Sequence, residues 1–510
     1  MNIVNIINFA RGCEPRVKDD SYLFETTKNE LELCRKHGFK STLLLQYDTL
    51  TDTRYTSLAK SHFPLVEVGL WFETVQPLVE DAGLKWRGRF PWDWHCDVGF
   101  LTGYTPSERK KLIDTAFNKF REIFGSFPAS VGSWHIDAYS LNYMAETYGI
   151  KAACCCKEQY GTDGYTLWGG YYNGGYYPSK KNMLSPAQNK EEQINVPVFR
   201  MLGPDPIRQY DMGRGHMNAG NGQGVVTLEP VYRGGGGNEN WVRSYFSQTF
   251  NGKTLSHAFT QAGQENSFGW EDISRGLPMQ FGLLDGLIKD GKVNLMTLTE
   301  AGDWFTENFA LTPPSAICAD DLYGGKEKTV WYSCKNYRAN VLFDGETAFF
   351  RDMYLFDENF EEKYLTEKEE THSCAYYTLP VIDGFRFSDE TVRAGLYFEK
   401  NGKKINISGF ESDTNGKDTA FIKTDAGLTV SMSENSICIG VPEGFTAVFE
   451  FAAGAPVPYL SADKKELKMS FAGVAGKEYS YSLRLSGGEF YTSDGKTVII
   501  PENEKITIKI

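Results

Sequence analysis

Residues 105–156 read TPSERKKLIDTAFNKFREIFGSFPASVGSWHIDAYSLNYMAETYGIKAACCC and contain two consecutive helix–strand units. The segment 106–124 predicts a helix, because its apolar residues recur on one stripe and Thr105 and Glu108 can form a capping box around a proline at the first helical position. Gly125 then ends it. The stretch continues with a predicted strand, helix and strand at residues 130–134, 138–148 and 151–156. Helices that alternate with buried strands indicate a parallel sheet.

The same alternation extends outward on both sides. A strand is predicted at residues 3–9, and a helix and a strand at 273–290 and 293–298. After the sequence LTPPS at 311–315, short β-rich runs separated by Gly, Asn and Asp turns replace the alternation. We therefore predict an α/β chain, with a (β/α)7-type catalytic barrel at residues 1–312 and an antiparallel β-sandwich domain at residues 316–510. The charged run KYLTEKEE at 363–370 is interpreted as a solvated segment.

Composition narrows the partners and the compartment. The 510 residues include 53 basic and 66 acidic side chains, a formal net charge of −13, which disfavours nucleic acid and anionic membranes as partners. No apolar run approaches the roughly 18 residues of a membrane span, and the N-terminus lacks the features of a secretion signal. The ten cysteines include no CxxC pair, so we expect free thiols. These features predict a soluble cytoplasmic protein; they do not fix its oligomeric state.

Aromatic residues make up 14% of the chain and are densest at 160–177, YGTDGYTLWGGYYNGGYY. Aromatic rings stack on the apolar face of a sugar ring, so this segment favours a carbohydrate as substrate or ligand; the alternative is a rigid loop packed on the barrel. The glycine run at 234–237 lacks the lysine and hydroxyl residue of a phosphate-binding loop. A neutral glycan or glycoside is the predicted partner.

Carboxylates follow several of the predicted strands, where barrel enzymes carry their functional groups. Arg11, Glu14 and Arg16 follow the first strand, Glu73 follows a later one, and Asp137 follows the strand at 130–134. Glu265 lies in the segment before the helix predicted at 273–290. Two of these carboxylates have a structural alternative: Asp137 could cap the helix at 138, and Glu73 could pair with Arg87 or Arg89. The glycines around Glu265 favour a shaped loop. The predicted substrate-binding residues are Trp71, Glu73, Trp94, His95, Asp97, Trp134, His135 and Trp270.

Two motifs resemble glycoside hydrolase family 57. Residues 132–140 (GSWHIDAYS) are similar to that family's Gly-x-Trp-Leu-Pro-Glu-x-Ala-Tyr region, and Asp137 falls on the position of its nucleophile. Residues 262–270 (AGQENSFGW) resemble its Asp-x-Glu-x-x-Gly region, with Glu265 as the nearest carboxylate to the acid/base. The layout also resembles family 38 α-mannosidases and polysaccharide deacetylases. The resemblance implies a glycoside hydrolase, retaining, with Asp137 as nucleophile and Glu265 as acid/base, and without a cofactor.

Two alternatives stay open. The pairs His95 with Asp97 and His135 with Asp137 share an HxD pattern, so a divalent-metal-dependent carbohydrate deacetylase or sugar isomerase could use His95, Asp97, Glu73 and His135. Against this, Asn8-Phe9-Ala10-Arg11 replaces the deacetylase Asp-Asp motif, and Trp71 stands where a metal-binding histidine is expected. The second alternative is a non-catalytic sugar-binding protein, which would bind glycans without a carboxylate pair in reach.

Overall fold

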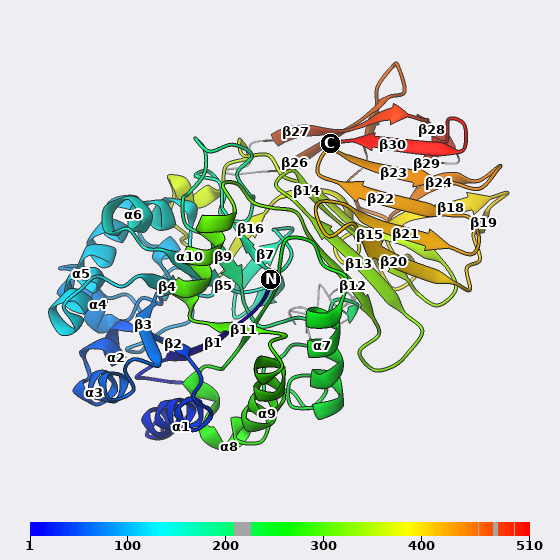
Figure 1. Cartoon of the computed structure of the whole chain (residues 1–510). Coiled ribbons are helices and arrows are strands. Elements are labelled where there is room, and N and C mark those ends of the chain that lie inside the picture. Colours follow the sequence, from blue (N-terminus) through cyan, green and yellow to red (C-terminus); the bar gives the residue numbers. More distant parts are fainter. Residues whose placement is uncertain (209–225, 457, 473–477, 494) are drawn as a thin grey trace.

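The structure is a computed structural model that describes residues 1–208, 226–456, 458–472, 478–493 and 495–510. Its N-terminal part is built around a nearly closed, barrel-like sheet (Figure 1). The strands of that sheet are β1 (Asn2–Ala10), β2 (Ser41–Leu45), β3 (Val66–Trp71), β4 (Ser130–Gly132), β5 (Ala152–Cys155), β8 (Gly175–Tyr176), β9 (Val198–Arg200), β10 (Ala258–Ala262) and β11 (Asn294–Met296).

Parallel pairing runs through the order β10-β1-β2-β3-β4-β5-β9, with β11 added beside β1 and β8 antiparallel to β9. In the described part of the chain no ladder joins β9 to β10, which leaves the sheet open there. Parallel strands of this kind are buried, and β1 is buried along almost its whole length. The mixed α/β class predicted from the sequence is confirmed; the (β/α)7 strand count stays an interpretation.

The helices pack outside the sheet, and their ends follow capping rules. They are α1 (Tyr22–His37), α2 (Tyr47–Thr51), α3 (Thr53–Ser61), α4 (Gln76–Asp81), α5 (Pro106–Phe124), α6 (Ala138–Tyr148), α7 (Glu239–Asn251), α8 (Trp270–Ile273), α9 (Gly276–Lys289) and α10 (Leu298–Asn308). Both bonds of the capping box predicted for α5 are present. The helix predicted at 273–290 is present as α9, which starts three residues later, and the short helix α8 before it was not predicted. The strand predicted at 293–298 stops at Met296, because Thr297 caps α10.

The C-terminal part consists of antiparallel strands in two sheets, whose buried side chains form one shared core. The first sheet holds β12 (Ser315–Asp320), β13 (Lys328–Ser333), β14 (Tyr337–Phe343), β15 (Ala348–Leu355), β17 (Leu379–Asp383), β18 (Gly395–Lys400), β19 (Lys403–Lys404), β24 (Thr446–Glu450), β28 (Glu489–Ser493) and β29 (Lys496–Ile500). The second holds β20 (Phe410–Thr414), β21 (Ala420–Thr424), β22 (Thr429–Ser433), β23 (Ser436–Gly440), β25 (Tyr459–Leu460), β26 (Glu466–Ala472), β27 (Glu478–Gly487) and β30 (Lys505–Lys509). Antiparallel sheets after residue 315 are as predicted; the β-sandwich description and the domain limits stay predictions.

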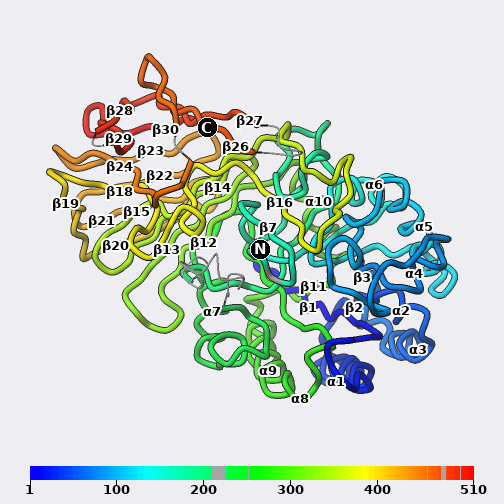
Figure 2. The backbone as a smooth tube through the Cα atoms, turned by 180° about the vertical axis from the view of Figure 1, so that it is seen from behind, coloured from blue at the N-terminus to red at the C-terminus, as the bar shows by residue number. Residues whose placement is uncertain are grey.

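One segment of the C-terminal part enters the N-terminal part. The strand β16 (Cys374–Tyr377) pairs in parallel with β7 (Tyr165–Trp168), which in turn pairs with β6 (Gln159–Thr162). Both views place β7 and β16 between the barrel-like sheet and the antiparallel sheets (Figure 2). Tyr364 and Glu369 are buried, at 1% and 4% exposure, so the interpretation of 363–370 as a solvated segment is wrong. The run is charged, but its side chains pack into the N-terminal part.

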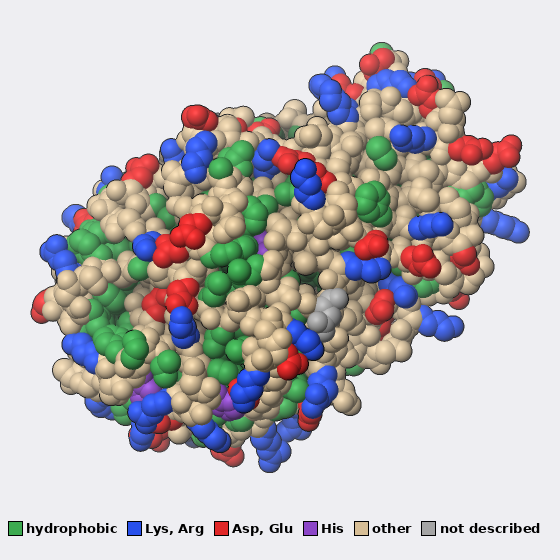
Figure 3. Space-filling model, viewed as in Figure 1, with side chains coloured by type: hydrophobic (Ala, Val, Ile, Leu, Met, Phe, Trp, Pro, Cys, Tyr) green, Lys and Arg blue, Asp and Glu red, His purple; other side chains and the backbone are tan. Residues whose placement is uncertain are grey.

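The surface agrees with the composition. Basic and acidic side chains are interspersed over the face shown in Figure 3. None of the helices in the described ranges combines the length and the apolar character that a membrane span requires.

Candidate active site

The carboxyl ends of four neighbouring strands carry a cluster of buried polar side chains. Arg11 directly follows β1, Gln46 follows β2, Glu73 lies two residues after β3, and Glu265 lies three residues after β10. Because these strands are parallel neighbours in the order β10-β1-β2-β3, their carboxyl ends meet at one edge of the sheet. The cluster therefore has the position in which barrel enzymes place their reacting groups.

Arg11 is the centre of this cluster. Its Nε and Nη2 donate to the two oxygens of Glu73 at 2.9 and 2.8 Å, and its Nη1 lies 3.3 Å from Glu265 Oε2 and 3.6 Å from Glu14 Oε2. The guanidinium is 4.3 Å from the centre of the Trp92 ring. Burial alone would lower the pKa of Arg11, but the carboxylates of Glu265 and Glu73 outweigh it and raise that pKa. Arg11 therefore stays charged.

Glu73 is fully buried and held in place. Besides the two bonds from Arg11, its Oε2 accepts a hydrogen bond of 2.8 Å from Gln46 Nε2. The sequence offered Arg87 or Arg89 as partners, but Arg89 binds Asp93 and Arg87 donates to the carbonyl of Gly103. These three hydrogen bonds fix the position of the Glu73 carboxylate at the end of β3.

Glu265 is in a different environment. Its Oε1 accepts a hydrogen bond of 2.6 Å from Ser267, whereas Oε2 is buried and makes no hydrogen bond with any described residue; the contact with Arg11 is an ion pair. Burial is the main reason that the pKa of Glu265 is raised to about 7; Glu73 and Glu229 add to this, while Arg11 and Ser267 oppose it. A carboxyl with this pKa can give and take a proton near neutral pH.

The loop that carries Glu265 is bound tightly to the end of β1. Gly263 has a φ of +98°, and a Cβ at this position would lie 2.3 Å from the carbonyl oxygen of Ile7. The Asn266 side chain accepts from the Arg11 amide at 3.0 Å and donates to the Arg11 carbonyl at 2.9 Å. These contacts fix Arg11 and Glu265 relative to one another, so the shaped loop inferred from the glycines is present.

Two further buried ionisable groups were not singled out from the sequence: Glu229, whose charge acts on Glu265, and Lys157, whose charge acts on Glu229. Gln264 Nε2 contacts Glu229 Oε1 at 3.5 Å, and burial raises the pKa of Glu229. Lys157 follows β5 and is 5% exposed; its ammonium donates to the carbonyl of Glu158, and burial lowers its pKa. Lys157 could have been found in the sequence, because it directly follows the strand predicted at 151–156. Glu229 follows no predicted strand, so the sequence around it gave no indication that it belongs to the site.

Asp137 lies in another environment. It caps α6, accepting from the Ser140 amide at 2.8 Å and from the Ser140 hydroxyl at 2.7 Å, and it forms an ion pair of 2.9 Å with Arg109. Both side chains of the ion pair are fully buried. No contact between Asp137 and Glu265 is present among the described residues. The alternative that the sequence left open for Asp137, a helix cap, describes these contacts. The carboxylates that share Arg11 with Glu265 are Glu73 and Glu14.

The tryptophans predicted to bind substrate differ in how deeply they are buried. Trp71 is 2% exposed and stacks on Phe9 at 4.0 Å, with Trp134 packed edge-on at 5.4 Å, so Trp71 is a core residue. Trp94 is only partly buried, and Arg16 lies 5.4 Å from its ring. Trp270 starts α8 and packs against a separate core cluster. Trp92, which directly supports Arg11, was not among the predicted substrate-binding residues.

The predicted histidines belong to two separate groups. His95 stacks on His372 at 3.7 Å, and these two with Asp97 bring three potential metal ligands within 4.8 Å of one another. His135 is buried beside Cys96 and Cys374, which form the second such group in the described part of the chain. Neither group includes Glu73, so the predicted metal set of His95, Asp97, Glu73 and His135 does not come together.

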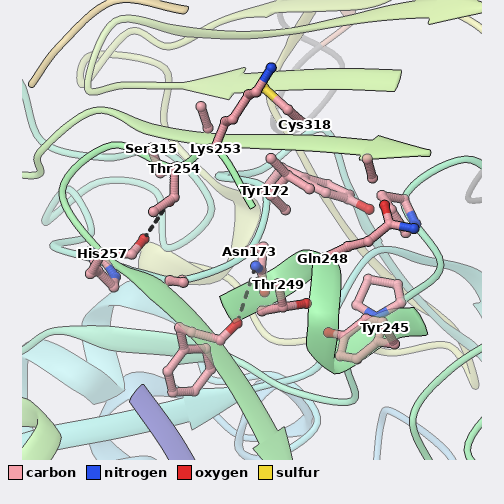
Figure 4. A pocket seen from close by; sticks show the side chains of 18 of the residues that line it. Tyr172, Asn173, Tyr245, Gln248, Thr249, Lys253, Thr254, His257, Ser315 and Cys318 are labelled. Carbon is pink, nitrogen blue, oxygen red and sulfur yellow. Dashed lines mark hydrogen bonds between the residues drawn. The ribbon is translucent and has the colours of Figure 1, made fainter. Parts of the chain in front are cut away.

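A cavity also lies away from the carboxylates. It is enclosed by α7, the start of β10 and β12, with Tyr172, Asn173, Tyr245 and Thr249 around it (Figure 4). Its volume of about 40 Å³ leaves room for a few water molecules. Glu265 follows the opposite end of β10, so this cavity is not part of the candidate active site.

Comparisons with known proteins give a family model and several distant structures. A family model described as a domain of unknown function with a solved structure (DUF3863) matches residues 95–273. No match was found among curated proteins. A provisionally assigned glycoside hydrolase/deacetylase from Parabacteroides distasonis is 15% identical, over 75% of this chain and 89% of that one, with a TM-score of 0.49.

Two further solved structures are similar at lower scores. A provisionally assigned polysaccharide deacetylase from Mycobacterium smegmatis is 10% identical, over 59% of this chain and 89% of that one, with a TM-score of 0.34. A 4-alpha-glucanotransferase from Thermococcus litoralis is 9% identical, over 99% and 98%, with a TM-score of 0.30. Similarity at these TM-scores says nothing about the activity of this chain, so a functional proposal has to rest on the residues of the site.

Proposed function

We propose that the chain is a carbohydrate-active enzyme, a glycoside hydrolase that cleaves a glycosidic bond of a neutral glycan or glycoside. The observation that carries this proposal is the state of Glu265. It is buried, one of its oxygens has no hydrogen bond with a described residue, and its pKa is raised to about 7 beside the Arg11-bound carboxylate of Glu73. Glycoside hydrolysis needs one carboxyl that is protonated near neutral pH and a second that is ionised. We infer a (β/α)7-type barrel, at residues 1–312, as the fold that presents this pair, followed by a β-sandwich at 316–510.

In this mechanism Glu265 is the general acid. It donates its proton to the leaving-group oxygen as the glycosidic C–O bond breaks, and the Glu73 carboxylate forms a bond to the anomeric carbon. Glu265, now ionised, takes a proton from water, whose oxygen displaces Glu73 and restores the starting state. Arg11 forms ion pairs with Glu73, Glu265 and Glu14. It can therefore stay paired with Glu265 and Glu14 when Glu73 loses its charge in the covalent intermediate. This assignment replaces Asp137 by Glu73 as the second carboxylate and keeps retention of configuration.

The test uses a panel of aryl glycosides and natural glycosides, assayed for released reducing sugar with the wild type, Glu265→Gln and Glu73→Gln. Loss of the general acid should cost about 10²–10⁴-fold on substrates with poor leaving groups and far less on dinitrophenyl glycosides, which leave without a proton. Glu271→Gln, an exposed carboxylate six residues further on, is the matched control and should be fully active. Full activity of Glu265→Gln, or tight glycan binding without turnover by the wild type, would reject the proposal; the second outcome is that of a sugar-binding protein.

One observation favours a second candidate, a divalent-metal-dependent carbohydrate deacetylase. His95, Asp97 and His372 bring three suitable ligand atoms within 4.8 Å, and one Asp97 oxygen is buried without a hydrogen bond in the described part of the chain. A bound metal would polarise an ester or amide carbonyl. This candidate predicts acetate release from acetylated oligosaccharides that is lost in His372→Gln and unchanged in Glu265→Gln. The glycosidase proposal predicts the reverse dependence.

A further inference from the structure

Three buried side chains from distant parts of the chain converge behind the His95 loop. Cys96 comes from the segment after β3, His135 from the segment after β4, and Cys374 is the first residue of β16. Their exposures are 0%, 3% and 4%. One ligand atom from each lies within 4.8 Å of the other two. The predicted role of His135 in substrate binding does not account for two thiols beside it.

The spacing of the ligand atoms fits a tetrahedral metal ion. His135 Nε2 and Cys374 Sγ are 3.5 Å apart. Two ligands of one tetrahedral Zn²⁺, with Zn–S about 2.3 Å and Zn–N about 2.1 Å, are about 3.6 Å apart. The two atoms therefore already have the separation that a shared ion would impose.

The surroundings orient the histidine for this task. The other ring nitrogen, Nδ1, is 3.3 Å from the Tyr376 hydroxyl, so a proton on Nδ1 can be donated to Tyr376 and leave the lone pair of Nε2 facing the thiols. The ring also packs on Phe100, with ring centres 4.3 Å apart. The Cys96 amide donates to the His372 carbonyl at 3.1 Å, which fixes the two cysteine-bearing segments side by side. Ligating histidines in proteins are usually held by such a second hydrogen bond.

We propose that Cys96, His135 and Cys374 bind a Zn²⁺ ion that joins the inserted segment at 374 to the loops after β3 and β4. Two thiolates and an imidazole are a soft ligand set, which favours zinc over calcium or magnesium. The remaining position of the tetrahedron is left for water. This site is separate from Arg11, Glu73 and Glu265, and it does not depend on the proposed glycosidase activity.

The test is the metal content of the full-length untagged chain, purified without chelator and measured by elemental mass spectrometry. We expect about one zinc per chain in the wild type and a loss of at least about tenfold in Cys96→Ser, Cys374→Ser and His135→Gln. His372→Gln and Cys154→Ser are matched controls: the first removes a histidine from the adjacent group, and the second removes another fully buried cysteine. Both should keep the zinc.

A second measurement keeps the proposal testable if the ligand variants do not fold. Wild-type protein exchanged with Co²⁺ should show the visible absorption of a tetrahedral site together with thiolate-to-cobalt charge-transfer bands. Wild-type protein without zinc that yields a disulfide-linked peptide joining Cys96 and Cys374, or two freely titrating thiols without cobalt bands, would overturn the proposal. Zinc that is lost in His372→Gln but kept in Cys96→Ser would also overturn it, by moving the metal to the neighbouring group.

Discussion

Replacement of Glu265 by Gln should stabilise the protein at neutral and alkaline pH while it slows turnover of substrates with poor leaving groups. The reason is that the folded structure holds this carboxyl in a site that disfavours its ionised form. Burial raises the pKa of Glu265 from its ordinary value of 4.5 to about 7. Glutamine has the same shape and no charge to desolvate, so the variant avoids that cost.

The sign and the pH window follow from proton linkage. A carboxyl with a raised pKa binds its proton more tightly in the folded chain than in the unfolded chain, so its contribution is most favourable below about 4.5 and is lost as the pH rises through about 7. A pKa difference between 4.5 and about 7 corresponds to about 3 kcal/mol of destabilisation above pH 7. The gain in Glu265→Gln should therefore be near zero at pH 4.5 and reach about 3 kcal/mol at pH 8. That corresponds to a rise in melting temperature on the order of 5 °C.

The assay is thermal unfolding of the wild type and the variant in a pH series, reported as the difference in melting temperature at each pH. Glu271→Gln again serves as the control and should show no difference that varies with pH between 5 and 8. A pH-independent difference for Glu265→Gln, or a variant less stable than the wild type at pH 8, would refute the reasoning. Either result would mean that Arg11 stabilises the Glu265 carboxylate more than burial destabilises it.

Two further predictions concern the parts around the site. Asp137→Asn keeps the helix cap but removes one charge of the buried ion pair with Arg109. It should therefore destabilise the protein by about 3–5 kcal/mol, while the folded fraction keeps its turnover. Loss of turnover without loss of stability would instead assign Asp137 to catalysis. Gly263→Ala should cost about 1–3 kcal/mol and lower kcat/KM, since the added Cβ meets the Ile7 carbonyl and shifts Glu265. Gly282→Ala is the matched control: it lies in α9 with open space around its Cβ position and should be neutral or stabilising by up to about 1 kcal/mol. If Gly263→Ala leaves kcat/KM as unchanged as Gly282→Ala does, the Glu265 loop is not rigid.

Local signals were sufficient for most of the N-terminal elements. The helix at 106–124 begins and ends as predicted, because its capping box and the left-handed glycine at 125 act within a few residues. The same holds for the helix at 138–148, which ends at Gly149 with a φ of 68°. The helix predicted at 273–290 starts three residues later, at Gly276, where no side chain caps the first turn of α9. The burial of Tyr364 could not be predicted locally, because this side chain belongs to the core cluster of the N-terminal part, and Arg109 and Thr102 of that part bind the backbone of the same run.

The site was predictable as a set of strand ends but not as a set of partners. That Arg11 and Glu73 follow strands could be seen in the sequence, and parallel strands bring such residues to one edge. The strand before Glu265, β10, was not predicted. Which carboxylate meets which cation depends on contacts across 62 residues for Arg11 with Glu73 and 254 residues for Arg11 with Glu265. For Asp137 the motif predicts a nucleophile and the local context a helix cap. The ion pair with Arg109 of α5 could not be predicted from either, because the two residues are 28 positions apart.

The charges of the site explain why one carboxyl differs from its neighbour. A single guanidinium faces three carboxylates, so it cannot neutralise all of them. Glu73 takes both parallel bonds and a third from Gln46, and Glu14 has Arg16 as a second partner at 2.7 Å. Glu265 is left with the longer ion pair to Arg11 and one serine hydroxyl, so burial dominates its pKa. Removing the competitor by Glu73→Gln frees Arg11 for Glu265 and should lower the pKa of Glu265. The stability difference between Glu73→Gln and the double variant Glu73→Gln/Glu265→Gln should then be smaller at pH 8 than the difference between the wild type and Glu265→Gln.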